Sequence, residues 1–291
     1  MFESIYKDIR YKIQTGNFWV RSIVLCTVIF ILVNLTKAYF TFSNAGFPGA
    51  LYYDVIQSIS LSSEWKHNLL YIWVWITHIF LHEGFFHLLW NMLWLYWLSA
   101  IVEDLIGKRH AILIFFEAAI FGGIFFIIST HFIPWYEGME IHASGASAAI
   151  CGLLFAAATI SPSYGIRLFL IGNVEIKYIA IFVLIMDLIL AGQVTNSGGH
   201  FAHIGGAIWG WVYILLLRQG VAMDGWLDYF ISDKTPSRYQ KPKETRVRQT
   251  KFKQTPSKEE KLNRILDKIK TQGIEKLTPE EREFLDQMSK E

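Results

Sequence analysis

Two polar side chains stand near the start of two apolar segments that are rich in small residues. Ser147 lies in a stretch, residues 141–166, that contains no Asp, Glu, Lys or Arg. His203 lies in a second such segment, in which Gly206 and Gly210 follow it. A serine hydroxyl and an imidazole about 2.6–3.2 Å apart can act as nucleophile and general base. The two residues therefore raise the prospect of nucleophilic chemistry inside a membrane.

The composition supports a membrane setting. Of the 291 residues, 53% are hydrophobic and 18% are charged, whereas soluble domains carry roughly 25% charged residues. Lys and Arg fall between the apolar segments and cluster after residue 233. The placement of the charges along the chain therefore indicates the class of protein better than the net charge of +2 does. We expect a polytopic membrane protein and no nucleic-acid partner. The two cysteines, Cys26 and Cys151, lie in apolar segments and provide neither a disulfide framework nor metal-ligand spacing.

Six segments are apolar enough to cross a bilayer, which takes about 20 residues in a helix. They are residues 20–42, 85–102, 111–130, 147–160, 178–191 and 200–217. A seventh apolar run, residues 69–81, spans only about 13 residues and suits an interfacial or re-entrant segment better. The predicted fold is therefore an all-α polytopic bundle of six transmembrane helices.

The loops between these segments differ in charge and so predict the orientation of the chain. Loops 107–110 and 163–177 are basic and fall on the same side as the N-terminus and the basic tail. Loops 135–140 and 193–199 contain no Lys or Arg. Six spans satisfy the positive-inside rule, and seven would break it. Both termini are thus expected in the cytoplasm, with residues 43–86 forming a long outer loop partly embedded in the interface.

This orientation places the two candidate residues at similar depth. Even-numbered spans enter the membrane from outside, and Ser147 and His203 lie near the starts of the fourth and sixth spans. Gly206 and Gly210, four residues apart, form a surface of small residues that lets two membrane helices approach closely. We therefore expect Ser147 and His203 to meet near the outer face.

His87 and Asn91 lie four residues apart near the start of the second span, on one face of its helix. Taken alone, they could simply tether the outer loop to the bundle. Together with Ser147 at the same depth, they could instead donate hydrogen bonds to an oxyanion formed during acyl transfer. The backbone N–H of Ser147 is a third candidate donor.

These motifs resemble those of the rhomboid intramembrane serine proteases, over roughly residues 20–217. The family carries H-x-x-x-N on its second span, G-x-S at the start of its fourth and A-H-x-x-G-x-x-x-G on its sixth. The matching residues here are His87 with Asn91, Gly145 with Ser147, and Ala202-His203 with Gly206 and Gly210. Each motif alone is weak, but three in this order and spacing are specific.

The resemblance implies a bacterial-type intramembrane endopeptidase that cuts transmembrane substrates near the outer face and needs no cofactor or metal. Ser147 would be the nucleophile and His203 the general base and acid, a dyad without an acidic third member. His87 and Asn91 would bind the oxyanion. It also implies that Glu103 is structural. One departure is Cys151, four residues after the serine, where the family usually has an aromatic ring that packs on the histidine.

The chain outside the bundle is expected to form separate segments. Residues 1–19 would be a cytoplasmic N-terminus, 20–218 the protease domain, 219–256 a basic linker and 257–291 a small helical hairpin. Pro279 at the start of the second hairpin helix and Gly273 after the first support two helices. The hairpin could bind a cytoplasmic partner, and the whole protein is expected in a bacterial inner membrane.

Three other functions each fit part of the sequence. A zinc protease would need H-E-x-x-H, but His82 and His87 are five residues apart, about 140° around a helix. A transporter is suggested by Glu117 and Asp187 within spans, although interhelical hydrogen bonds explain them as well. A rhomboid-like protein that binds clients without cutting them is the remaining alternative. Such proteins usually lack the serine or the histidine, and this chain has both.

Overall fold

The computed structural model describes residues 17–168, 172–193, 196–221, 223 and 258–288. The chain divides into two compact units, one within residues 1–239 and the other within residues 240–291. Most of the expected N-terminal segment and linker lie outside the described residues.

Each of the six expected segments is a helix in the first unit, which confirms an all-α polytopic bundle. The six helices are α2 (Phe18–Ser43), α6 (Phe85–Ile106), α7 (Lys108–Phe132), α8 (Ser147–Ile160), α9 (Ile176–Leu190) and α10 (Ser197–Arg218). In the described part of the chain, α2, α6, α7 and α10 are long and apolar enough to cross a membrane. Helices α8 and α9 are shorter, with 14 and 15 residues.

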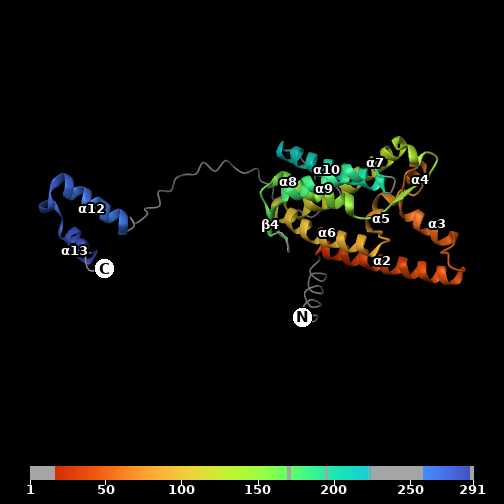
Figure 1. Ribbon diagram of the computed structural model, residues 1–291, viewed down its shortest axis with the longest axis horizontal. Helices are drawn as coiled ribbons and strands as arrows, with labels where there is room; N and C mark the ends of the chain where they lie inside the picture. Colours follow the sequence, from red (N-terminus) through yellow and green to blue (C-terminus); the bar gives the residue numbers. More distant parts are fainter. Residues whose placement is uncertain (1–16, 169–171, 194–195, 222, 224–257, 289–291) are drawn as a thin grey trace, which may run out of the picture. The chain divides into compact units, whose positions relative to one another are not determined.

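Helix α8 is the central helix of the bundle, and it packs against α6, α7, α9 and α10. Figure 1 shows α2 and α6 on one side of α8 and α10 on the other. Nine residues of α8 are buried, most of them small or aliphatic. A helix that is apolar on every face is typically buried on every face. The central position of α8 therefore agrees with its uniformly apolar sequence.

Glycines on α10 let its backbone lie directly on α8. A Cβ atom at Gly206 would collide with the carbonyl oxygen of Ala148, and one at Gly210 with that of Gly152. Both positions confirm the close approach predicted from the small residues. Because the two backbones touch, side chains near the starts of the two helices can also meet.

The long loop between α2 and α6 contains three short helices, α3 (Ala50–Ile59), α4 (Trp65–Leu70) and α5 (Val74–Phe80). Helices α4 and α5 have six and seven residues, too few to cross a bilayer. The run at 69–81 is therefore not a seventh span. In this loop, β1 (Leu61–Ser62) pairs antiparallel with β2 (His142–Ala143), which lies just before α8.

A second two-stranded sheet was not foreseen. β3 (Gly165–Leu168) pairs antiparallel with β4 (Gly172–Glu175) between α8 and α9, with Gly165 opposite Glu175. This hairpin and the helices α3 and α4 lie at opposite ends of the bundle in Figure 1. Helices α6, α8 and α10 therefore all begin at the end that carries α3–α5.

Partly buried carboxylates join helices, which agrees with the interhelical hydrogen bonds that the sequence offers as the alternative to a transport role. Trp209 on α10 donates a hydrogen bond from Nε1 to Glu117 on α7, at 3.1 Å. Trp19 on α2 donates from Nε1 to Glu103 on α6, at 2.6 Å. The second contact agrees with a structural role for Glu103.

The second unit contains α12 (Lys258–Gln272) and α13 (Pro279–Met288). Gly273 follows α12 with φ of 85°, and α13 begins at Pro279, as the sequence predicted. The backbone N–H of Thr278 donates to Glu281 at 2.8 Å, and that of Glu281 donates back to the Thr278 hydroxyl at 3.3 Å. Lys268 also bonds Glu281, so one carboxylate joins both helices.

Candidate active site

Ser147 is the first residue of α8, and the turn before it has an unusual backbone. Gly145 adopts φ of +120°, a conformation that side chains disfavour. A Cβ atom there would lie only 2.7 Å from Cε1 of His87. The glycine of the Gly-x-Ser motif therefore serves two needs, because it permits the turn and leaves space for the His87 ring.

Residues of the loop between α2 and α6 hold this turn in place. The N–H of Gly145 donates to the carbonyl oxygen of His78 at 2.8 Å, and the N–H of Ala146 points to Nε2 of His82 at 3.4 Å. His82 is buried. His82 therefore lies beside the turn as a hydrogen-bond acceptor, which is a different role from zinc ligation.

Ser147 and His203 meet as the sequence predicted. The Ser147 hydroxyl oxygen lies 2.8 Å from Nε2 of His203. This is the distance expected for a nucleophile bonded to its general base. Helices α8 and α10 position the two side chains, and the glycine contacts between them keep the separation short.

A carboxylate contacts the other nitrogen of His203, which corrects the expectation of a histidine without an acidic neighbour. Oδ1 of Asp187, on α9, lies 2.8 Å from Nδ1 of His203. The same oxygen lies 2.8 Å from Nδ1 of His200, one turn earlier on α10. Asp187 is only 5% exposed. Its interhelical contacts agree with the sequence interpretation, but the partners were not foreseen.

His87 and Asn91 lie beside the serine, on α6. Both line the same cavity as Ser147. The amide nitrogen of Asn91 donates to the backbone carbonyl of His87 at 2.8 Å, which uses one of its two N–H groups. The second N–H and the His87 ring are the donors that the two residues can offer to a bound molecule.

The cavity beside Ser147 has a volume of about 560 Å³. Its lining is largely apolar, with the polar groups of Ser147, His203, His87 and Asn91 on its walls. Phe182 and Met186 of α9 complete the lining on another side. A partly apolar cleft with a few convergent polar groups is typical of a small-molecule or peptide site.

Cys151 lies one turn below Ser147 and is buried. Ligand atoms of Cys151, Asp187 and His203 all lie within 4.8 Å of one another. Thiolate, carboxylate and imidazole are a donor set that zinc accepts. Two of these three residues, Asp187 and His203, are already joined to each other by a hydrogen bond.

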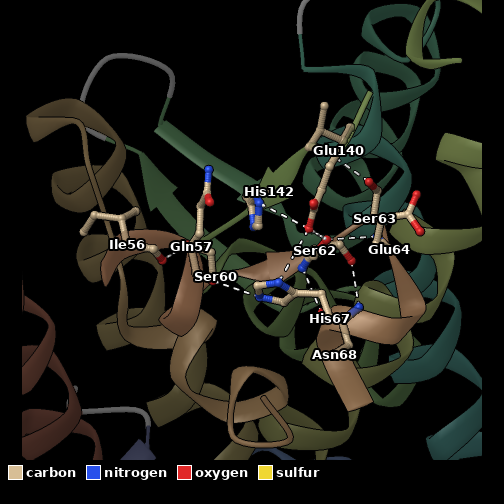
Figure 2. Close-up of polar contacts among 11 residues, drawn as sticks. Ile56, Gln57, Ser60, Ser62, Ser63, Glu64, His67, Asn68, Glu140 and His142 are labelled. Atoms are coloured by element: carbon tan, nitrogen blue, oxygen red, sulfur yellow. Dashed lines mark hydrogen bonds and ion pairs between the residues drawn. The ribbon is translucent and has the colours of Figure 1, made fainter. Parts of the chain in front are cut away.

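A polar cluster joins the loop between α2 and α6 to the strand that precedes the serine turn (Figure 2). Oε1 of Glu140 accepts a hydrogen bond from the Ser62 hydroxyl at 2.6 Å, and it lies 3.5 Å from Nδ1 of His67 and 3.6 Å from Nε2 of His142. Asn68 bonds both the N–H and the carbonyl of Ser62. Burial lowers the pKa of His142 below its usual value, which favours the neutral ring. The cluster thereby fixes β1 against β2.

Sequence reasoning missed Asp187 and His200 as members of the site. The signals were present, since an aspartate within an apolar segment is costly and His200 and His203, three residues apart, share one helix face. What the sequence did not indicate was that α9 turns Asp187 toward α10.

The fold and the site together define a helical membrane protein with a serine–histidine pair beside a cleft. A family model described as "Rhomboid domain" matches residues 70–220, just over half of the chain. The chain belongs to the rhomboid family. Residues 251–291 match a second family, DUF6576, whose function is unknown.

Curated relatives are similar over part of the chain. The Rhomboid protease GlpG of Yersinia pseudotuberculosis serotype I (strain IP32953) is 26% identical over 160 residues, covering 53% of this chain and 48% of that protein. The Rhomboid protease GlpG of Salmonella choleraesuis (strain SC-B67) is 31% identical over 97 residues, or 33% of each chain. The chain thus spans about half the length, or less, of these relatives.

Proposed function

We propose that this protein is an intramembrane serine endopeptidase that cleaves transmembrane segments near the outer membrane face. The observation that carries the proposal is the 2.8 Å contact between the Ser147 hydroxyl and Nε2 of His203, beside a cleft of about 560 Å³. Membership of a family whose relatives are named proteases supports it. The chain therefore contains both a candidate nucleophile and a candidate base at hydrogen-bonding distance.

In the proposed reaction, Nε2 of His203 takes the proton of the Ser147 hydroxyl as its oxygen attacks a substrate carbonyl carbon. The imidazolium then gives this proton to the leaving amine as the peptide bond breaks. Water hydrolyses the resulting ester through the same base. Such proton transfers by a positioned side chain typically contribute about 10²–10⁴-fold to the rate.

His87 and Asn91 would donate hydrogen bonds to the oxyanion. The backbone N–H of Ser147 would be a third donor, because N–H groups in the first turn of a helix lack an intrahelical acceptor. Their positions on the walls of the serine cleft support this role. Removing one oxyanion donor typically costs about 10²–10³-fold in turnover.

The proposed setting is a bacterial inner membrane with both termini in the cytoplasm. Residues 1–19 would form the N-terminus, 20–218 the protease domain, 219–256 a linker and 257–291 a hairpin that binds a cytoplasmic partner. The exposed apolar side chains of α2 support contact with lipid. The substrates would be transmembrane proteins that enter the cleft from the bilayer.

The test compares labelling by a fluorophosphonate probe in the parent protein and in Ser147→Ala, with the purified protein in detergent. We expect labelling of the parent and none of the variant, because only an activated serine attacks the probe. His203→Ala should lose labelling as well. Equal labelling of parent and Ser147→Ala would overturn the proposal.

A second measurement addresses the alternative of a client-binding protein that does not cut. Parent and Ser147→Ala are reconstituted in liposomes with a fusion protein that has one transmembrane segment. Cleavage by the parent alone supports the endopeptidase, and binding without cleavage by either protein supports the alternative. Cleavage should persist in a chelator, since the proposed reaction uses no metal.

A further inference from the structure

We infer that Asp187 positions His203 for the reaction, so that the functional unit is a serine–histidine–aspartate triad spread over α8, α10 and α9. This inference rests on the proposed function, which needs only Ser147 and His203. It adds a third residue, from a helix that none of the motifs includes. The carboxylate would act through the imidazole and would not touch the substrate.

The hydrogen-bonding geometry fixes which nitrogen of His203 carries the proton. A carboxylate oxygen only accepts hydrogen bonds, so Nδ1 of His203, at 2.8 Å from Asp187 Oδ1, must donate. In the neutral ring, Nε2 then keeps its lone pair. That lone pair is directed at the Ser147 hydroxyl, also at 2.8 Å. Asp187 thus selects the tautomer that can act as a base.

The same contact stabilises the ring after it accepts the proton. Transfer from Ser147 makes His203 an imidazolium, while Nδ1–H continues to donate to the carboxylate. The new positive charge therefore forms beside a negative one, and no further proton moves. Asp187 is only 5% exposed, so water screens this attraction little.

His200 restricts the carboxylate to one position. Its Nδ1 lies 2.8 Å from the same oxygen of Asp187, and its ring meets that of His203 edge to face with centroids 5.7 Å apart. Two donors from successive turns of α10 converge on one oxygen atom. Asp187 therefore cannot turn away without losing both bonds.

This arrangement also answers how the base is held when Cys151 replaces an aromatic ring. A thiol is too small to cover an imidazole face, so packing from that position orients His203 poorly. The hydrogen bond from Nδ1 of His203 to the fixed carboxylate of Asp187 instead limits how far the imidazole ring can rotate. The structure thus provides a polar positioning device on α9 where the family pattern has an apolar one on α8.

The competing explanation is that Asp187 only ties α9 to α10. Asp187→Asn separates the two explanations, because the amide keeps the size and one acceptor oxygen but removes the charge. Glu117→Gln is the matched control. It makes the same change in another bundle carboxylate, whose partner, Trp209, can still donate to the remaining oxygen.

The experiment measures kcat and KM for cleavage of a single-span fusion protein in liposomes with chelator present, together with the thermal unfolding midpoint. For Asp187→Asn we expect kcat to fall by about 10²-fold, with KM within twofold of the parent and the midpoint close to that of Glu117→Gln. Asp187→Glu, which restores the charge, should recover part of the kcat. The chelator ensures that an ion held by Cys151, Asp187 and His203 does not affect the comparison.

The inference is overturned if the kcat of Asp187→Asn is within twofold of the kcat of Glu117→Gln. If Asp187→Asn folds poorly, Asp187→Glu provides the test, because it restores the charge. A kcat of Asp187→Glu no higher than that of Asp187→Asn would show that the charge is not needed and would reject the inference. Ser147→Ala keeps the two proposals distinguishable. Cleavage that survives Ser147→Ala rejects the protease proposal itself, whereas cleavage lost there but retained in Asp187→Asn rejects only the triad.

Discussion

Among single residues, the site depends on glycines at positions where a neighbouring side chain or backbone lies very close. Gly145 illustrates this most directly, because its missing Cβ leaves the space in which the His87 ring lies. Its φ of +120° also allows the turn that presents Ser147 at the first position of α8. One glycine thus sets the positions of both the proposed nucleophile and a proposed oxyanion donor.

Gly145→Ala is expected to lower turnover about 10²-fold or more, the cost of one lost oxyanion donor. The added Cβ would lie 2.7 Å from the His87 ring and displace it. The measurement is cleavage of the single-span fusion protein in liposomes.

Gly138→Ala is the control for backbone strain. Gly138 also has positive φ, +73°, but a Cβ there would meet no atom within 4 Å. Comparable losses of turnover in Gly145→Ala and Gly138→Ala would mean that backbone strain, and not displacement of His87, lowers the turnover.

At the scale of the elements, the contact between α8 and α10 determines the geometry of the pair. Gly206 and Gly210 bring the α10 backbone against that of α8, and the 2.8 Å contact of Ser147 and His203 follows from it. The strands β1 and β2 contribute at the same end, since they join the loop between α2 and α6 to the segment before Ser147. The end of the bundle that carries Ser147 is therefore held by backbone contacts on two sides.

Gly210→Val is expected to lower the free energy of unfolding of the bundle by about 1–3 kcal/mol, the usual cost of overpacking. The side chain would collide with the Gly152 backbone and separate the two helices. Thermal unfolding in detergent measures the change. Ile208→Val is the control, because Ile208 is 40% exposed on the same helix, and a similar midpoint for both variants would contradict the close-contact explanation.

At the scale of the whole molecule, α6, α8 and α10 all begin at one end of the bundle, the end that carries α3–α5. The β3–β4 hairpin lies at the other end (Figure 1). If the basic loops face the cytoplasm, as the positive-inside rule predicts, the serine cleft opens toward the outer face. The orientation is therefore testable at two exposed loops.

Glu137→Cys and Ser163→Cys place single exposed thiols on the two loops that flank α8 on either side. The native cysteines, Cys26 and Cys151, are buried. With a membrane-impermeant maleimide on intact cells, we expect labelling at position 137 and labelling at position 163 only after lysis. The reverse pattern would invert the proposed topology.

Much of this arrangement could be predicted from the sequence because it depends on local patterns. Apolar length located all six helices, and the spacing of Gly206 and Gly210 indicated a close helix contact. The motif positions placed Ser147, His203, His87 and Asn91 at one end of the bundle. The first two inferences use residues within one segment, where helical periodicity relates sequence distance to position. The third adds only the alternating direction of successive spans.

Apolar segment lengths and motif spacing suffice to predict a bundle of six membrane helices with a hydroxyl and an imidazole at similar depth. The contact of Asp187 with His203, and the support that the loop between α2 and α6 gives to the serine turn, are seen in the folded structure alone. The direction of a side chain on α9 depends on how that helix is rotated against α10, and pairing of β1 with β2 joins segments about 80 residues apart. Such relations arise from packing between distant segments, which spacing along the chain does not specify.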